Sequence, residues 1–496
     1  MAVHLDASTA RRWFDLALRS LAAARQSLDA LNVFPVPDAD TGSNVVRTLS
    51  AGARSAQELP ADATLGELAA ALAEGSLWGA RGNSGVILAQ SLQAIAQTFE
   101  GLEIATGDDV IRAFDALASA ATSAVAEPAE GTIITVAREV AATAVEMPPG
   151  AGVDDVVAAA LAAAYEATDA TTSQLPVLAE TGKVDAGAVC LVIIIEALAE
   201  VLGLPVTPHD EWFPAPGTGP ADSAIAGYEV MYILRAGRRD AKNLQRRLTQ
   251  IGEAVVVVRG AGDLWHVHVH LAHPEEALAD GDMSQVVVRR LDIAGRPLGI
   301  VATTTAPGLL EPLAEAGAVA VLSARARTIA RAIIDTGARD VVVLPCSADS
   351  AVQAGVASRH ETVIAEDISV SLAPTRGNLA VLDAVALLAP SLQFAGGPRA
   401  ARGDADAALA RLGHAQAGTR QFSSARADLT EAELLRAAQE LAGGGAELLT
   451  VLAGASPAAT PAAHRIVNLV RALEPDVEAY VLRGGQALPA LEASAQ

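Results

Sequence analysis

The chain has 496 residues, of which 51% are hydrophobic and only 3% aromatic, and its formal net charge is −23 at pH 7. This length predicts about two to four domains, and the acidic charge argues against nucleic acid as a partner, because a polyphosphate duplex would be repelled. Two cysteines are too few for a disulfide framework. They fit a reducing cytosol, where we expect the protein.

Residues 1–205 predict an all-helical barrel or bundle, because apolar residues recur at three- and four-residue spacing. Thr64 and Glu67 have the spacing of a capping box before an apolar run. The longest apolar stretch, residues 188–204, is interrupted by Glu196 and Glu200 and predicts a buried helix, not a membrane span. The expected helices lie near residues 8–31, 64–78, 84–99, 108–124, 132–146, 153–168 and 186–203.

The most informative loop is LNVFPVPDADTGSNVV at 31–46, where two prolines exclude helix just before Asp38 and Asp40. Two carboxylates at this spacing can converge on magnesium, whose remaining ligands are usually phosphates and water. A helix begins close behind them, and a helix N-terminus is itself a phosphate site. The alternative interpretation is an Asp-rich turn that only caps the helix. Residues that would form the phosphate or metal shell are Thr41, Gly42, Ser43 and Asn44.

Three later stretches repeat the combination of glycine with a hydroxyl or acidic residue at the start of a helix. The first, WGARGNSGVILAQSL at 78–92, is not a Walker P-loop, since no lysine follows its last glycine. Its alternative interpretation is a loop and helix cap. We expect these turns to meet the first loop at one rim. The candidate residues are Gly82, Asn83, Ser84 and Gly85, then Thr132 in PAEGTIITVARE, then Asp185 in TGKVDAGAVCL.

Beyond residue 205 the pattern changes. Residues 206–222 carry four prolines and predict a linker. Residues 223–295 predict a small α+β domain, with strands around an amphipathic segment at 240–252. Short β-rich runs, among them LGIVATTT, DVVVLPCS, ETVIAED and LLTVLAG, alternate with helical patterns from 296 onward and predict a parallel α/β sheet. Residues 395–426 are weakly patterned and predict an excursion or a joint between subdomains.

The run HVHVH places His266, His268 and His270 on one face of a strand, so these imidazoles could share a metal ion. The alternative is a set of exposed strand histidines without metal, because zinc requires four well-placed donors.

The four N-terminal motifs together resemble the DhaL-type nucleotide domain of the dihydroxyacetone-kinase superfamily. Their form and order are most similar to the ATP-binding subunits of bacterial fatty acid kinases. The resemblance implies ATP and two magnesium ions held by Asp38 and Asp40, with the glycine-rich loop on the nucleotide. Asn32 lies one position away from a further aspartate of dihydroxyacetone kinases and becomes a third candidate magnesium ligand. It also implies four regions: a helical DhaL-type barrel (1–205), a Pro-rich linker (206–222), an α+β middle domain (223–295) and an α/β DegV-like domain (296–496).

The chain departs from this family at three places. Ala39 stands where the family usually has glycine. In the middle domain the family binds zinc through a His-Val-His pair, matched by His268 and His270, and a cysteine replaced here by Glu229. A carboxylate can ligate zinc, so a zinc site of these three residues is expected in altered form. The C-terminal domain lacks the Gly-Gly-Gln-Thr-Met-Asn-Pro-Ser stretch and has SARARTIARA at 323–332.

The resemblance implies a kinase subunit that phosphorylates the carboxylate of a fatty acid presented by a separate DegV-like carrier protein, giving acyl phosphate and ADP. It also implies a homodimer. Two rival functions stay open. One is a self-contained kinase of a small soluble substrate such as dihydroxyacetone. The other is a non-catalytic nucleotide-sensing or scaffold protein, which the altered C-terminal domain favours.

Overall fold

The computed structural model describes residues 4–35, 37, 39–213, 227–260, 262–291, 297–392, 405–416, 419–443 and 446–496. Asp38 and residues 214–222 of the expected linker lie outside these ranges. The chain divides into two compact units, which are described separately. The first is Met1–Ile225 with Ala236–His268, and the second is Ala226–Arg235 with Val269–Gln496.

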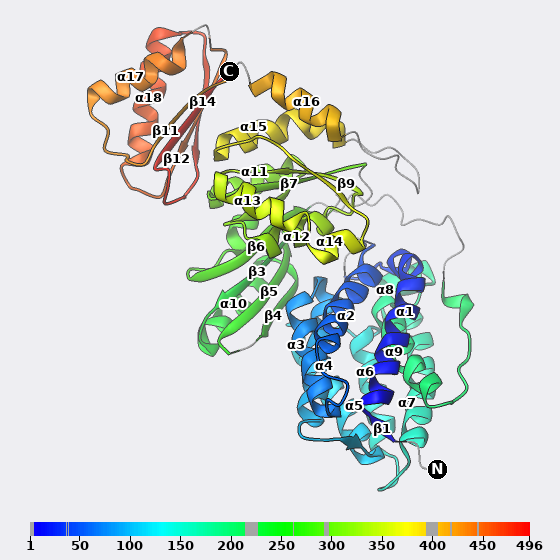
Figure 1. The fold of residues 1–496 in the computed structure, drawn as a ribbon. Helices are drawn as coiled ribbons and strands as arrows, with labels where there is room; N and C mark the ends of the chain where they lie inside the picture. The colour runs from blue at the N-terminus through cyan, green and yellow to red at the C-terminus, as the bar shows by residue number, and fades with distance from the viewer. Residues whose placement is uncertain are drawn as a thin grey trace. The chain divides into compact units, whose positions relative to one another are not determined.

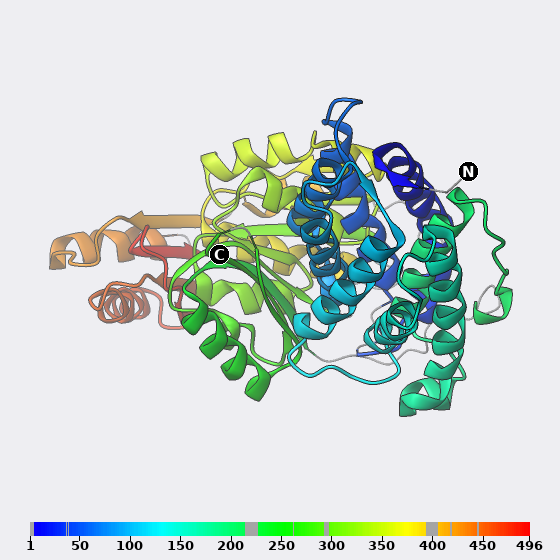
Figure 2. The same ribbon diagram turned by 90° about the horizontal axis from the view of Figure 1, so that it is seen from below.

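The first unit begins with the expected helical bundle, whose long helices lie alongside one another in both views (Figures 1 and 2). The seven expected helices are confirmed, most of them within two residues, although α7 runs six residues further than expected. Thr64 and Glu67 form the predicted capping box. The helices are α1 Ala7–Leu31, α2 Thr41–Gln57, α3 Leu65–Gly79, α4 Gly82–Thr98, α5 Gly107–Ala124, α6 Ile133–Val145, α7 Val153–Gln174, α8 Pro176–Thr181 and α9 Ala186–Val201.

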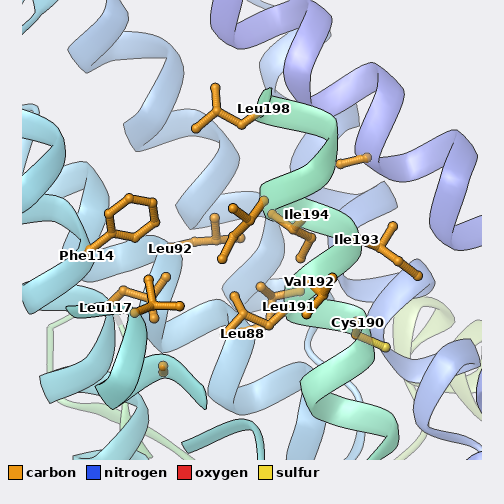
Figure 3. Close-up of a cluster of buried hydrophobic side chains, with 14 of the residues drawn as sticks. Leu88, Leu92, Phe114, Leu117, Cys190, Leu191, Val192, Ile193, Ile194 and Leu198 are labelled. Atoms are coloured by element: carbon orange, nitrogen blue, oxygen red, sulfur yellow. The ribbon is translucent and has the colours of Figure 1, made fainter. Parts of the chain in front are cut away.

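Helix α9 is the centre of this bundle. Its apolar residues are buried on nearly every side and pack against α1, α6 and α7. Figure 3 shows its side chains beside Leu88 and Leu92 of α4 and Phe114 and Leu117 of α5. The expected buried helix is therefore confirmed. Among the described residues, no helix combines the length and apolarity needed to cross a bilayer.

The first unit also contains α10 Arg238–Ile251, β4 Glu253–Arg259 and most of β5 Leu264–Leu271. Strand β4 contacts α4 and α5, and its Val256 and Val258 belong to the same buried apolar core as the helices. The side chain of Gln90 donates a hydrogen bond to the carbonyl of Arg259 at 3.2 Å. The start of the middle domain is thus fixed against the helical bundle.

Strands of the second unit neighbour one another in the order β10-β9-β7-β8-β6-β3. The pairs β10–β9, β9–β7 and β7–β8 are parallel, whereas β8–β6 and β6–β3 are antiparallel. Helices α12, α13 and α14 contribute to a core that covers one face of this sheet. The strands are β3 Tyr228–Arg235, β6 Asp282–Arg290, β7 Leu298–Thr304, β8 Val319–Leu322, β9 Asp340–Leu344 and β10 Ser369–Leu372; the helices are α11 Leu310–Glu315, α12 Ala326–Asp335, α13 Ala348–Ala357, α14 Glu361–Ala365 and α15 Asn378–Leu388.

A second sheet follows, in the order β11-β14-β12-β13, with α17 and α18 packed on it (Figure 1). Only β12 and β13 are parallel in it. The α/β class of the C-terminal region is confirmed, but its division into two sheets was not predicted. The elements are β11 Arg420–Ser424, α17 Glu431–Ala442, β12 Leu448–Ala453, α18 Ala459–Leu473, β13 Glu478–Arg483 and β14 Leu491–Ala495.

Two local predictions were wrong. The run ETVIAED forms the short helix α14, not a strand, because His360 caps it and Val363 is fully buried in the core with α12. Tertiary packing here overrides β propensity. The weakly patterned segment 395–426 contains helix α16 Ala405–Gln416 and strand β11, so it is more ordered than its composition indicated.

Candidate functional site

The starts of four helices in the first unit meet at a cavity of about 250 Å³. Its wall includes residues that the loops and caps were expected to supply, together with Phe34 and Pro35 from the loop before α2. The expectation that these turns share a rim therefore describes what the structure brings together. The predicted residues in the wall are Thr41 of α2, Asn83 and Ser84 of α4, Thr132 before α6 and Asp185 before α9.

Asp40 is the N-cap residue of α2, but its side chain makes no capping hydrogen bond. The capping role belongs to Asp29 of α1, whose carboxylate accepts hydrogen bonds from the backbone N–H of Ser43 at 2.8 Å and from its hydroxyl at 2.7 Å. Cap-only use of Asp40, the alternative interpretation, is therefore not what the geometry shows. An N-cap carboxylate that does not cap suits a metal ion with oxygen ligands.

Asp29 is a site residue that the sequence interpretation missed. Burial raises the pKa of Asp29 to about 6, and the negative charge of Asp40 raises it further, against the hydrogen bonds of Ser43 and the charge of Arg47. The site thus holds two carboxylates close enough to repel each other. One signal was available: Asp29 lies in the last turn of α1, where the helix dipole disfavours an acidic side chain.

Gly82 and Gly85 do not line the cavity, and their role is close packing of α4 on α2. A Cβ atom on Gly82, which has a φ of +53°, would lie 2.3 Å from the Asn44 amide nitrogen. A Cβ atom on Gly85 would lie 2.4 Å from the Thr48 hydroxyl. Gly42 packs in the same way against the backbone of α1. The glycines therefore set the spacing of the helices, while Asn83 and Ser84 between them reach the cavity.

Asp185 holds the starts of two helices together. Its Oδ2 accepts hydrogen bonds from the N–H of Ala188 in α9 at 2.8 Å and of Ile133 in α6 at 3.0 Å. Burial raises the pKa of Asp185 to about 6 despite these bonds. Nearby, Lys183 donates a hydrogen bond to the carbonyl of Ala30 at 2.7 Å. The KVDAG motif therefore fastens α9 to α6 and α1 at the edge of the cavity.

Of the other predicted magnesium ligands, Asp38 lies outside the described residues. Asn32 is buried at the C-cap of α1 and does not line the cavity. Asn83 offers a further oxygen, because its Oδ1 is buried and has no hydrogen-bond partner in the described part of the chain. Asp40 and Asn83 are thus the described oxygen donors that fit a magnesium ion here.

Ala39 has a φ of +54°, the left-handed region that glycine adopts without strain. We expect Ala39→Gly to raise the free energy of unfolding by about 0.5–1 kcal/mol, as relief of strain exceeds the added chain entropy. Urea unfolding followed by circular dichroism would measure the change. The control, Ala70→Gly at an exposed position of α3, should lose about 1 kcal/mol. Equal losses in both variants would contradict a strained Ala39.

The expected zinc ligands Glu229, His268 and His270 come together in the middle domain. Each offers one ligand atom, these atoms lie within 4.8 Å of one another, and all three residues are buried. His270 Nε2 lies 3.9 Å from Glu229 Oε1, while Glu229 Oε2 accepts a hydrogen bond from Arg289. One carboxylate oxygen can therefore face a metal while the other is held by Arg289, as ligating carboxylates commonly are. His266 belongs to a different environment, edge-on to Trp78 at 6.3 Å between ring centroids.

We expect protein purified without chelators to contain about one zinc ion per chain. Elemental analysis would measure it. His268→Ala should remove the metal, whereas His266→Ala should retain it. Zinc retained equally in both variants, or absent from the unmodified chain, would contradict this site.

Two regions of the chain match known domain families. Residues 35–200 match the DAK2 domain family, and residues 226–293 match the FakA-like family, which is the middle domain of fatty acid kinase subunits of that type. The chain carries both domains. The resemblance stated from the four motifs is therefore confirmed for these two regions.

Several relatives share this part of the chain. An uncharacterized protein of Staphylococcus saprophyticus is 32% identical over 272 residues, which are 51% of this chain and 49% of that protein. Protein YloV of Bacillus subtilis is 32% identical over 295 residues, 55% of this chain and 52% of its own. The chain thus spans about half the length of the curated relatives it matches.

Two solved structures are also similar. The dihydroxyacetone kinase of C. freundii in complex with AMP-PNP and Mg²⁺ covers 40% of this chain and 35% of its own, with 23% identity and a TM-score of 0.31. A DegV family protein of Corynebacterium glutamicum covers 40% of this chain and 96% of its own, with 11% identity and a TM-score of 0.30.

Proposed function

We propose that the chain is the ATP-binding subunit of a two-component acyl kinase. The observation that carries this proposal is the cavity in the DAK2 domain, lined by hydroxyl, amide and acidic groups from four helix starts. The adjoining FakA-like middle domain supports an acyl substrate. Helix N-termini favour phosphate groups, and Asp40 adds a carboxylate that is not used as a cap.

In this proposal Asp40, with Asp38 and Asn83, holds magnesium, which neutralises phosphate charge when it is bound. Thr41 and Ser84 donate hydrogen bonds to phosphate oxygens from the starts of α2 and α4. A substrate carboxylate is already ionised at pH 7, so it attacks the γ-phosphorus without a general base. The chain's own residues then position phosphates and exclude water, and they need not transfer a proton.

The size of the cavity supports a substrate delivered by a second protein. A volume of about 250 Å³ is below the roughly 300–1,000 Å³ usual for a small-molecule site. It can hold part of a nucleotide but not an acyl chain as well. Burial of a hydrocarbon tail is worth about 0.8 kcal/mol for each CH₂ group, so a fatty acid needs a long apolar cavity. A DegV-like carrier would provide that cavity and expose only the carboxylate.

We expect slow ATP hydrolysis by the chain alone, and acyl-phosphate formation at about 1–100 s⁻¹ once a fatty-acid-loaded DegV-like carrier is added. Trapping acyl phosphate as the hydroxamate, with and without carrier and magnesium, would measure this dependence. Phosphorylation of dihydroxyacetone at such rates without any carrier would contradict the two-component proposal. ADP binding without turnover, whichever carrier from the same organism is added, would favour a nucleotide sensor instead.

A further inference from the structure

Part of the cavity wall comes from outside the helical bundle. It is formed where α10 ends and β4 begins, at residues 249–255, called the α10–β4 turn below. No motif in the sequence pointed to this segment, which belongs to the middle domain family and not to the DAK2 domain. The lining residues of the turn are Thr249, Gly252, Glu253, Ala254 and Val255.

The turn is held firmly against the bundle. The carbonyl of Val255 accepts a hydrogen bond from the N–H of Ala126, in the connection between α5 and α6, at 3.4 Å. Directly after it, Val256 and Val258 are 0% and 5% exposed in the core shared with α4 and α5. Burial of such side chains is worth about 1.5–3 kcal/mol each. The wall is therefore a fixed part of the first unit.

The chemistry of the wall is different on this side. Thr41 and the adjacent Asp40 mark the α2 end, where charge and hydroxyl groups suit phosphates. Beside the α10–β4 turn the lining is mainly apolar, and it is formed by Ile87, Val125, Ala126, Ala254 and Val255. A nucleotide has the same two-part character, with charged phosphates at one end and a flat, weakly polar base at the other.

We infer that the α10–β4 turn is the base-side wall of the nucleotide site, so that the middle domain completes a pocket begun by the DAK2 domain. This inference rests on the proposed nucleotide function. The ligand class is a nucleoside diphosphate or triphosphate with its base against Val255 and its phosphates toward Asp40. Because ligand binding stabilises the parts that contact it, nucleotide binding tightens the packing of β4 on α4 and α5.

A bulky side chain in the turn tests the contact directly. Thr249 is half-buried in the cavity wall, whereas its neighbour Gln250 is exposed and does not line the cavity. Thr249→Trp should weaken MgADP binding by about tenfold or more, and the matched control Gln250→Trp should stay within about twofold. Calorimetry on the full chain measures both affinities, and circular dichroism verifies that both variants are folded.

Hydrogen exchange on the unmodified chain gives an independent readout if Thr249→Trp does not fold. Saturating MgADP should slow exchange of the backbone amides of residues 252–256 by about tenfold. Unchanged exchange there, with MgADP bound, overturns the inference while leaving the proposed function intact, as does full MgADP affinity in a folded Thr249→Trp variant. Failure of the unmodified chain to bind MgADP at all overturns both.

Discussion

Asp40→Asn is expected to abolish magnesium-dependent nucleotide binding while leaving the fold unharmed. Asparagine keeps the size of the side chain but loses the charge that attracts the ion. Even partners that only support a metal ligand typically change affinity by about 10–100-fold, and loss of the ligand itself should cost at least about 100-fold. Calorimetric titration with MgATP measures the effect.

Stability should move in the opposite direction in this variant. The side chain of Asp40 makes no capping hydrogen bond that could be lost. Its charge raises the pKa of Asp29, so its removal relieves repulsion between two carboxylates. Asp40→Asn should therefore be at least as stable as the unmodified chain. The control is Asp15→Asn, which removes one exposed charge from α1 and should change neither property. Unaltered MgATP affinity in Asp40→Asn would contradict its role as a ligand.

Asp185 should show the second large effect, on stability. In Asp185→Ala the N–H groups of Ile133 and Ala188 lose their shared acceptor, and their desolvation is left uncompensated. The expected loss is on the order of 3 kcal/mol. In Asp185→Asn the amide oxygen can still accept both bonds, so stability near pH 7 should be preserved. Urea unfolding of the helical unit, followed by far-UV circular dichroism, measures both variants.

The pH dependence of this pair has a definite sign. The folded-state pKa of Asp185 is about 6, above its ordinary value of 3.8, so the folded chain binds the proton more tightly than the unfolded chain. The stability that this carboxyl contributes is fully present below pH 3.8 and is lost as the pH rises through 6. Relative to Asp185→Asn, the unmodified chain should lose about 2–3 kcal/mol between about pH 4 and pH 7. Parallel pH profiles would contradict a buried, tightly held proton.

The helical part of the fold was readable from the sequence because its signals are local. Apolar spacing, capping residues such as Thr64 and breakers such as Pro35 fix where helices begin and end. The loops that carry Asp40, Ser84, Thr132 and Asp185 were found for the same reason. Each is a helix start, and helix starts attract the residue types that also bind phosphate.

The remaining features depend on contacts between distant segments, which no local pattern encodes. Asp29 reaches Ser43 from the end of a different helix. The α10–β4 turn reaches the cavity from another domain family, more than a hundred residues beyond Ala126. Val363 sits in a β-like run but is buried in a helix. In the loops, the glycines proved to be packing residues because Asn44 and Thr48 lie against them.

A titration of the unmodified full chain with ADP, in the presence and absence of magnesium, tests the proposed nucleotide site itself. We predict one saturable site per chain that requires the metal, because the cavity combines phosphate donors with the Asp40 carboxylate. Absence of binding with magnesium present, or binding of equal affinity without it, would contradict a magnesium-dependent nucleotide site in this domain.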